Sequence, residues 1–332
     1  MLADGAISGA VAAAIAEGER VRGTTSPNPP VGCVLVDAHG ETIARAATHP
    51  AGGPHAEAAA LAAAGERARG ATAVVTLEPC NHTGRTGPCA QALARAGVAE
   101  VVYLTGDPNP VAAGGADYLR AHGVVVRHLA RRVEALQPWL TSLKRGRPAV
   151  TWKYAATADG FTAAANGTSQ WITGELARAR VHEDRARRDA IIVGTGTAIA
   201  DNPSLTARRP DGTLYPWQPR RVVVGTREVP AGNLTDLGFE QYPGPREALR
   251  ALWETGARDV LLEGGATLSR GMLEAGLIDA VQAYVAPAFL GAGRGVLGGQ
   301  VAGTIGQAVR FTTTRVEQIG EDIYIEMERQ GD

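Results

Sequence analysis

Lysine is nearly absent from this sequence, which contains only Lys144 and Lys153 among its 332 residues. Arginine therefore carries almost all of the positive charge, and 33 basic against 34 acidic residues leave a formal net charge of −1. This balance disfavours a broad electrostatic surface for nucleic acid or for an anionic membrane. Aromatic residues, at 5%, are also too few for the stacking platforms that bind single strands. We therefore expect a small-molecule partner, with no nucleic acid and no membrane.

The sequence also contains few cysteines, and it shows neither a long apolar run nor the pattern of a secretion signal. The chain has 3 cysteines, none of them in a CxxC pair, which excludes a disulfide framework. No apolar run approaches the ~20 residues of a membrane-spanning helix. Residues 1–20 lack a basic segment and contain acidic residues, which is typical of a helix and not of a signal peptide. We expect a cytoplasmic protein.

What the chain does contain is an alternation of β-rich and helix-forming segments, typical of layered α/β proteins. The first half predicts a largely parallel sheet and helices over 5–21, 55–68 and 87–98. The pattern restarts near residue 146, and the length suits two domains, which we place at 1–146 and 147–332. The second half predicts strands at 149–156, 189–194, 220–225 and 258–262, helices at 174–186, 245–255 and 266–275, and a β-rich end over 278–329.

A group of potential zinc ligands lies in the first half. His55 and Glu57 open a predicted helix, Cys80 ends a β-rich run, and Cys89 begins the next helix. Zinc favours imidazole and thiolate, and three protein ligands leave a fourth position for a water whose pKa falls to about 7. Glu57 is close enough in sequence to act as the proton shuttle without being a ligand. The third cysteine, Cys33, lies in a β-rich run and is expected to be a core residue.

The zinc-ligand pattern resembles the nucleobase deaminase signature, in which a His-x-Glu motif precedes a Pro-Cys and a second cysteine. Here eight residues separate the cysteines, as in the bifunctional diaminohydroxyphosphoribosylaminopyrimidine deaminase/5-amino-6-(5-phosphoribosylamino)uracil reductase family of riboflavin biosynthesis. The segments TTSPNPPVGCVLVD (24–37), PHAE (54–57) and GATAVVTLEPCNHTGRTGPC (70–89) are similar to that family. The resemblance implies a cytidine-deaminase-like three-layer domain. It also implies four substrate contacts, at Asn28, His49, His82 and Arg85.

Glycine-rich turns mark the second half. A predicted strand runs into Glu263-Gly264-Gly265 and then a helix, which presents backbone amides where cofactor phosphates could bind. Gly194-Thr195-Gly196-Thr197 is a second such turn. Neither is a GxGxxG sequence, so the Rossmann fingerprint is absent.

The second half resembles the reductase domain of the same family, which has a dihydrofolate-reductase-like fold and uses NADPH. The similar segments are KYAATADG (153–160), SQWIT (169–173), GTGTAIADNPSLTAR (194–208) and VLLEGGATLSRGML (260–273). The resemblance assigns catalysis to Lys153 and Asp201. It assigns the cofactor site to Ala156, Trp171, Thr197, Asp201, Thr226, Gly265, Ala266, Thr267, Leu268, Ser269, Arg270 and Gly271. It assigns the phosphosugar substrate to Ser169, Arg185, Leu205, Arg208 and Glu263.

The implied reaction has two steps. Zinc-dependent hydrolysis deaminates 2,5-diamino-6-ribosylamino-4(3H)-pyrimidinone 5′-phosphate, and NADPH then reduces the ribosyl group, giving 5-amino-6-(5-phosphoribitylamino)uracil. The resemblance also carries the expectation of a homodimer.

The second half departs from the family at several places, which leaves alternatives open. The segment between Thr226 and Asp259 is short and poor in strand signals. Gly225 stands where the family usually has aspartate, and Phe161 where it usually has a basic residue. An active deaminase with a degenerate, structural reductase-like domain is therefore an alternative. A nucleic-acid-editing deaminase is disfavoured by the charge and the few aromatic residues.

Overall fold

A computed structural model of the chain describes residues 4–82 and 87–330. The chain divides into two compact units, Met1–Lys144 and Arg145–Asp332. Among the described helices, none combines the length and the apolar character needed to cross a membrane.

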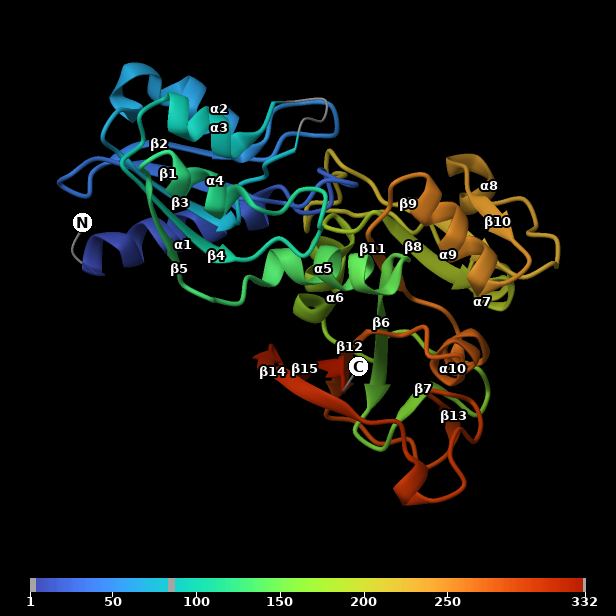
Figure 1. Ribbon diagram of the computed structural model, residues 1–332. Helices are drawn as coiled ribbons and strands as arrows, with labels where there is room; N and C mark the ends of the chain where they lie inside the picture. The colour runs from blue at the N-terminus through green and yellow to red at the C-terminus, as the bar shows by residue number, and fades with distance from the viewer. Residues whose placement is uncertain (1–3, 83–86, 331–332) are drawn as a thin grey trace. The chain divides into compact units, whose positions relative to one another are not determined.

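The first unit is built on a five-stranded sheet of order β2-β1-β3-β4-β5. Its strands are β1 (Gly32–Val36), β2 (Thr42–Ala47), β3 (Thr72–Leu77), β4 (Glu100–Thr105) and β5 (Val125–His128). Its helices are α1 (Asp4–Arg20), α2 (Ala56–Ala64), α3 (Cys89–Arg95), α4 (Gly115–Ala121) and α5 (Gln137–Arg145), with 3-10 turns η1 (Gly65–Ala68) and η2 (Glu134–Leu136). Every residue of β1 and β3 is buried, because helices cover both faces of the sheet. Figure 1 shows α2 and α3 on one face and α1 on the other, which confirms the three-layer fold.

The prediction of a largely parallel first sheet is wrong in part. β3, β4 and β5 are parallel to one another, but β1 is antiparallel to both β2 and β3. The crossover through α2 makes β2 and β3 run in the same direction, as such connections do. β1 forms a hairpin with β2 and inserts between these two strands, so it opposes both. The same sheet buries Cys33 completely, as expected for a core residue.

The second unit contains an eight-stranded sheet of order β10-β9-β8-β11-β6-β12-β15-β14. The pairs from β10 to β12 are parallel, and β15 is antiparallel to β12 and β14. The strands are β6 (Ala149–Thr157), β8 (Ala190–Gly194), β9 (Arg220–Val224), β10 (Glu240–Tyr242), β11 (Asp259–Leu262), β12 (Ala280–Ala286), β14 (Phe311–Ile319) and β15 (Asp322–Arg329). β7 (Phe161–Ala164) and β13 (Gly293–Gly295) pair separately.

Five helices connect these strands, together with the 3-10 turn η3 (Ile305–Gln307). They are α6 (Glu175–Arg185), α7 (Thr195–Asp201), α8 (Asn233–Leu237), α9 (Pro245–Glu254) and α10 (Ala266–Glu274). The segment between Thr226 and Asp259, expected to be poor in strands, contains the helices α8 and α9 and one strand, the three-residue β10. The glycine-rich turn at residues 194–197 leads directly into a helix, α7, which the sequence analysis did not predict.

Candidate functional sites

The three predicted zinc ligands are brought together at the ends of three elements of the first unit. His55 is the N-cap residue of α2, and Cys89 is the first residue of α3. Cys80 follows β3, in a loop held by hydrogen bonds from the Asn81 amide to the Ala112 carbonyl (2.9 Å) and from the Ala90 amide to the Cys80 carbonyl (3.1 Å). The main chain therefore fixes where both thiols lie.

The spacing of the three side chains fits a zinc ion. The His55 Nδ1 atom lies 3.7 Å from the Cys80 Sγ atom and 3.5 Å from the Cys89 Sγ atom. A tetrahedral zinc ion, with its usual bond lengths to sulfur and nitrogen, would place such atoms roughly 3.6 Å apart. All three ligand atoms lie within 4.8 Å of one another, and both cysteines are buried. Two thiolates and one imidazole, with the fourth position left to water, are typical of a catalytic zinc site.

The protonation of the cluster also suits a cation. The Cys89 thiol donates to Cys80, and this hydrogen bond lowers the pKa of Cys80 to about 4. The same hydrogen bond raises the pKa of Cys89, and burial raises it further. A hydrogen bond with Cys80 raises the pKa of His55. The surroundings therefore favour a thiolate at Cys80, and metal binding to such a cluster releases protons from its thiols.

Glu57 lies in the first turn of α2, beside the cluster but outside its three ligands. Its residue surface is 4% exposed. Burial raises the pKa of Glu57 to about 7, and the negative charge of Cys80 contributes in the same direction. A carboxyl group with a pKa near neutrality can both accept and return a proton, as a shuttle must.

The predicted substrate contacts of this unit lie in three places. Asn28 is half-buried in the loop before β1, and His49 is exposed in the loop before α2. His82 is half-buried, and its Nδ1 atom is buried without a hydrogen-bond partner among the described residues. A buried nitrogen of this kind costs free energy unless a ligand or water satisfies it. The fourth candidate, Arg85, lies outside the described residues.

Replacing Cys89 with serine is expected to remove the zinc. A serine hydroxyl is a poor zinc ligand, so we expect affinity to fall by more than the roughly tenfold cost of a lost supporting contact. The zinc content of the purified variant, measured by elemental mass spectrometry, tests this expectation. Cys33→Ala, which removes the cysteine from the core, is the matched control and should keep its zinc. An unchanged zinc content in Cys89→Ser would refute the ligand role.

A second candidate site is a cavity of about 330 Å³ in the second unit. It is lined by residues 152–155 of β6, by residues 263–265 directly after β11 and by the first residue of α10. Eight residues predicted for the reductase site line it: Lys153, Ser169, Trp171, Thr197, Asp201, Glu263, Gly265 and Ala266. A Cβ atom at Gly265 would lie 2.9 Å from the Thr197 hydroxyl oxygen, so α7 and α10 begin close together.

The other predicted residues lie outside the cavity lining. Ala156 and Ser269 are buried, and Ser269 donates to the Gly264 carbonyl (3.2 Å). Leu205 is 3% exposed and packs in an apolar core cluster, so only its backbone could reach a ligand. The remaining residues outside the lining are Arg185, Arg208, Thr226, Thr267, Leu268, Arg270 and Gly271.

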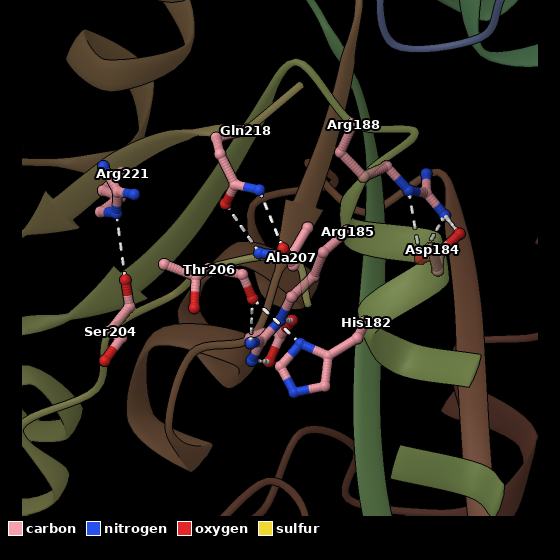
Figure 2. A network of polar contacts seen from close by, with 10 residues as sticks. His182, Asp184, Arg185, Arg188, Ser204, Thr206, Ala207, Gln218 and Arg221 are labelled. Atoms are coloured by element: carbon pink, nitrogen blue, oxygen red, sulfur yellow. Dashed lines mark hydrogen bonds and ion pairs between the residues drawn. The ribbon is translucent and has the colours of Figure 1, made fainter. Parts of the chain in front are cut away.

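Arg185 forms the centre of a charged network beside the cavity, drawn in Figure 2. Its guanidinium donates to both carboxylate oxygens of Glu263 at 2.7 Å and to the Thr206 carbonyl at 3.0 Å. Burial alone would raise the pKa of Glu263, but Arg185 outweighs it and lowers this pKa to about 2. Burial lowers the pKa of Lys153, and Glu263 opposes that change. The pair thus keeps a permanent carboxylate next to the lysine.

The loop that carries Leu205 and Arg208 is held in place from two sides. His182 Nδ1 lies 3.0 Å from the Thr206 carbonyl oxygen, and Gln218 bonds both the amide and the carbonyl of Ala207. Figure 2 shows these contacts converging on residues 206–207. Burial and the charges of Arg185 and Arg208 lower the pKa of His182. Arg208, which is exposed beside this loop and forms no ion pair among the described residues, suits a phosphate-bearing substrate.

Sequence reasoning missed Arg178, which lines the cavity, and His182. The Arg178 guanidinium lies 4.5 Å from the centre of the Trp171 ring. A signal was available, because Arg178, His182 and Arg185 follow an i, i+4, i+7 spacing and so share one face of α6.

The structure explains why position 225 is a glycine in this chain. Gly225 adopts φ +128°, and a Cβ atom there would lie 2.7 Å from the Thr195 hydroxyl oxygen. A larger residue would be strained and would collide with the start of α7. Gly225 and Thr195 therefore fit each other, and the glycine is no sign of a collapsed site.

Comparisons with known proteins were made for both units. Residues 148–325 match the family described as RibD C-terminal domain, and residues 7–105 match the cytidine and deoxycytidylate deaminase zinc-binding region. The chain is 56% identical over 304 residues to riboflavin biosynthesis protein RibD of Corynebacterium ammoniagenes, covering 89% of this chain and 90% of the relative. It is 48% identical over 330 residues to the RibD protein of Mycobacterium tuberculosis, covering 97% of each.

Solved structures are similar over the same length. A crystal structure of a diaminohydroxyphosphoribosylaminopyrimidine deaminase/5-amino-6-(5-phosphoribosylamino)uracil reductase from Thermotoga maritima is 31% identical, with a TM-score of 0.87. The match covers 98% of this chain and 99% of that one. RibD of Acinetobacter baumannii is 36% identical, with a TM-score of 0.84 and the same coverage.

Proposed function

The chain belongs to the RibD family of bifunctional riboflavin biosynthesis enzymes, and we propose which of its residues carry the two activities. It is a deaminase that uses Zn²⁺ and a reductase that uses NADPH. The deaminase activity belongs to the first unit and the reductase activity to the second. The substrate of the first step is 2,5-diamino-6-ribosylamino-4(3H)-pyrimidinone 5′-phosphate.

In the first step, His55, Cys80 and Cys89 hold the zinc ion. When bound, zinc supplies an acidified water for attack on the ring carbon that carries the amine. Glu57 accepts a proton from this water on its carboxylate and delivers it to the exocyclic nitrogen, which leaves as ammonia. The burial of Glu57 supports this role, because it keeps the carboxyl group poised near neutrality. His82 Nδ1, buried without a partner among the described residues, is a donor or acceptor for the substrate. Asn28, His49 and Arg85 complete the substrate contacts.

In the second step, hydride from NADPH is delivered to C1 of the ring-opened ribosyl group, and a proton must reach the attached nitrogen. Lys153 supplies that proton from its ammonium group, and Asp201 assists at the other side of the same cavity. Glu263 orients Arg185, which with Arg208 and Ser169 binds the phosphosugar. The cofactor phosphates lie at the start of α10, where the backbone amides of the first turn after Gly265 have no partner within the helix. The rest of the segment up to Gly271 completes the cofactor site.

A homodimer in the cytoplasm is the remaining part of the proposal. It is supported only by the family to which the chain belongs. Sedimentation of the purified protein tests the dimer directly.

The observation that carries the proposal is that one chain combines the His55, Cys80 and Cys89 cluster with a cavity holding Lys153 and Glu263. A degenerate second half is not favoured, because the cavity keeps its charged groups. Mass spectrometry of the products, with zinc-loaded protein and the diaminopyrimidinone substrate, tests both steps. We expect a deaminated compound without NADPH and its two-hydrogen-heavier ribityl form with NADPH. A product that stops at deamination in both cases would refute the reductase part.

A further inference from the structure

The second unit has a topological switch point between β8 and β11. From β8 the chain passes through α7 to β9, then to β10, and returns through α9 to β11 on the opposite side of β8. These strands are parallel and lie side by side, as Figure 1 shows, so their carboxyl ends share one edge of the sheet. Ligands of open α/β sheets bind in the crevice at such a point. A dinucleotide is therefore expected to cross the sheet here.

The two ends of that crevice differ in chemistry. On one side, Lys153 on β6 and Glu263 after β11 mark where the reacting ring must lie. On the other side, the loop after β9 presents Thr226 and Arg227. Neighbouring strands lie about 4.8 Å apart, so β6 and β9 are roughly 14 Å apart. An extended dinucleotide with its nicotinamide at Lys153 thus brings its adenosine ribose to the loop after β9.

Hydrogen bonds fix the backbone and the side chain of Arg227 in the loop after β9. Gln241 on β10 donates to the carbonyl oxygens of Gly225 (2.8 Å) and Arg227 (2.9 Å), which fixes the backbone. The Arg227 Nε atom donates to the Thr195 hydroxyl (3.4 Å), so the guanidinium lies over the start of α7. A Cβ atom at Gly196 would lie 3.2 Å from the Arg227 Nη2 atom.

The charge of Arg227 is not neutralised within the described chain. Three other arginines of this unit are each paired with carboxylates: Arg185 with Glu263, Arg188 with Asp184 and Asp259, and Arg220 with Glu240. Arg227 is exposed and forms no ion pair with any described carboxylate, including that of its neighbour Glu228. An arginine fork with a free charge matches a phosphate group.

We propose that Arg227 binds the phosphate on the 2′-oxygen of the adenosine ribose and so selects NADPH over NADH. The inference rests on the proposed reductase function. NADH carries a hydroxyl group at this position, which an arginine does not favour, whereas an acidic residue at this place would favour NADH. Arg227 supplies the positive charge at this end of the crevice, and Gln241 is the positioning residue.

Direct binding measurements on the zinc-loaded full chain test the inference. Titration calorimetry compares NADPH with NADH, and 2′,5′-ADP with 5′-AMP, for the wild type, Arg227→Gln and Arg227→Lys. We expect Arg227→Gln to weaken NADPH and 2′,5′-ADP by roughly tenfold to a hundredfold, the value of a charge-assisted hydrogen bond. NADH and 5′-AMP should change by less than about twofold, because they lack the phosphate group. Arg227→Lys should fall between the wild type and Arg227→Gln.

The matched control is Arg250→Gln, which removes an exposed arginine from α9. It should bind all four compounds as the wild type does, which separates a specific contact from a change in net charge. Wild-type binding of NADPH that Arg227→Gln leaves unchanged would overturn this inference and leave the proposed function intact. Equally tight binding of NADPH and NADH by the wild type would also overturn this inference and leave the proposed function intact. A wild type that binds neither cofactor would overturn both.

Discussion

Glu57→Gln is expected to abolish deamination while the protein keeps its zinc. Glutamine has nearly the same shape as glutamate but cannot accept the proton of the attacking water. Loss of a positioned acid–base group slows a reaction by roughly 10²–10⁴-fold. The three ligands are untouched, because Glu57 lies outside the group formed by His55, Cys80 and Cys89. The measurement is ammonia release from the diaminopyrimidinone substrate, with zinc content determined on the same sample.

Structure and catalysis can be separated in this experiment. Glu57 is 4% exposed and its burial penalises the carboxylate, so the neutral amide should not destabilise the first unit. An unchanged thermal unfolding midpoint would confirm that only the shuttle is lost. Glu66→Gln, an exposed position in η1 directly after α2, is the matched control and should deaminate normally. Turnover near the wild-type rate in Glu57→Gln would remove Glu57 from the mechanism.

The zinc cluster could be predicted because its ligand types are rare and lie at element boundaries. Three cysteines in the whole chain leave few alternatives, and Cys80 and Cys89 stand where a β-rich run ends and a helix begins. The structure places both at those boundaries. The position of Glu57 followed from that of His55, since both open the same helix. The packing of Cys33 followed from its β-rich, apolar surroundings.

The features that could not be predicted from the sequence depend on contacts between distant segments. The antiparallel pairing of β1 with β3 results from the insertion of a hairpin between two strands, which no local pattern encodes. The helix α7 and the strand β10 are too short for a periodic signal. Leu205 was expected at the substrate, and its side chain belongs to the core, so only its backbone could contact a ligand. The bidentate pairing of Arg185 with Glu263 joins residues far apart in the sequence.

Lys153→Met is expected to remove the second activity and leave the first. Lys153 lines the cavity, and the zinc ligands lie in the other unit. If its ammonium group donates the proton that accompanies hydride transfer, NADPH oxidation should slow by roughly 10²–10⁴-fold. A single-turnover measurement of NADPH oxidation on the deaminated intermediate checks this. Lys144→Met, which alters the exposed lysine of α5, is the control and should oxidise NADPH at the wild-type rate.

Substitution of Lys153 by arginine tests whether the residue donates a proton or only fills space and supplies positive charge. Burial lowers the pKa of Lys153, which makes its ammonium group a better acid than an exposed lysine. Arginine keeps the positive charge but does not give up a proton in proteins, so Lys153→Arg should fail to restore the rate. The donor must be protonated, so the wild-type rate should fall as the pH rises through the pKa of Lys153. Lys153→Arg should lose that pH dependence together with its activity. Full reduction by Lys153→Arg would mean that position 153 supplies only positive charge, and the proton would then have to come from Asp201 or from solvent.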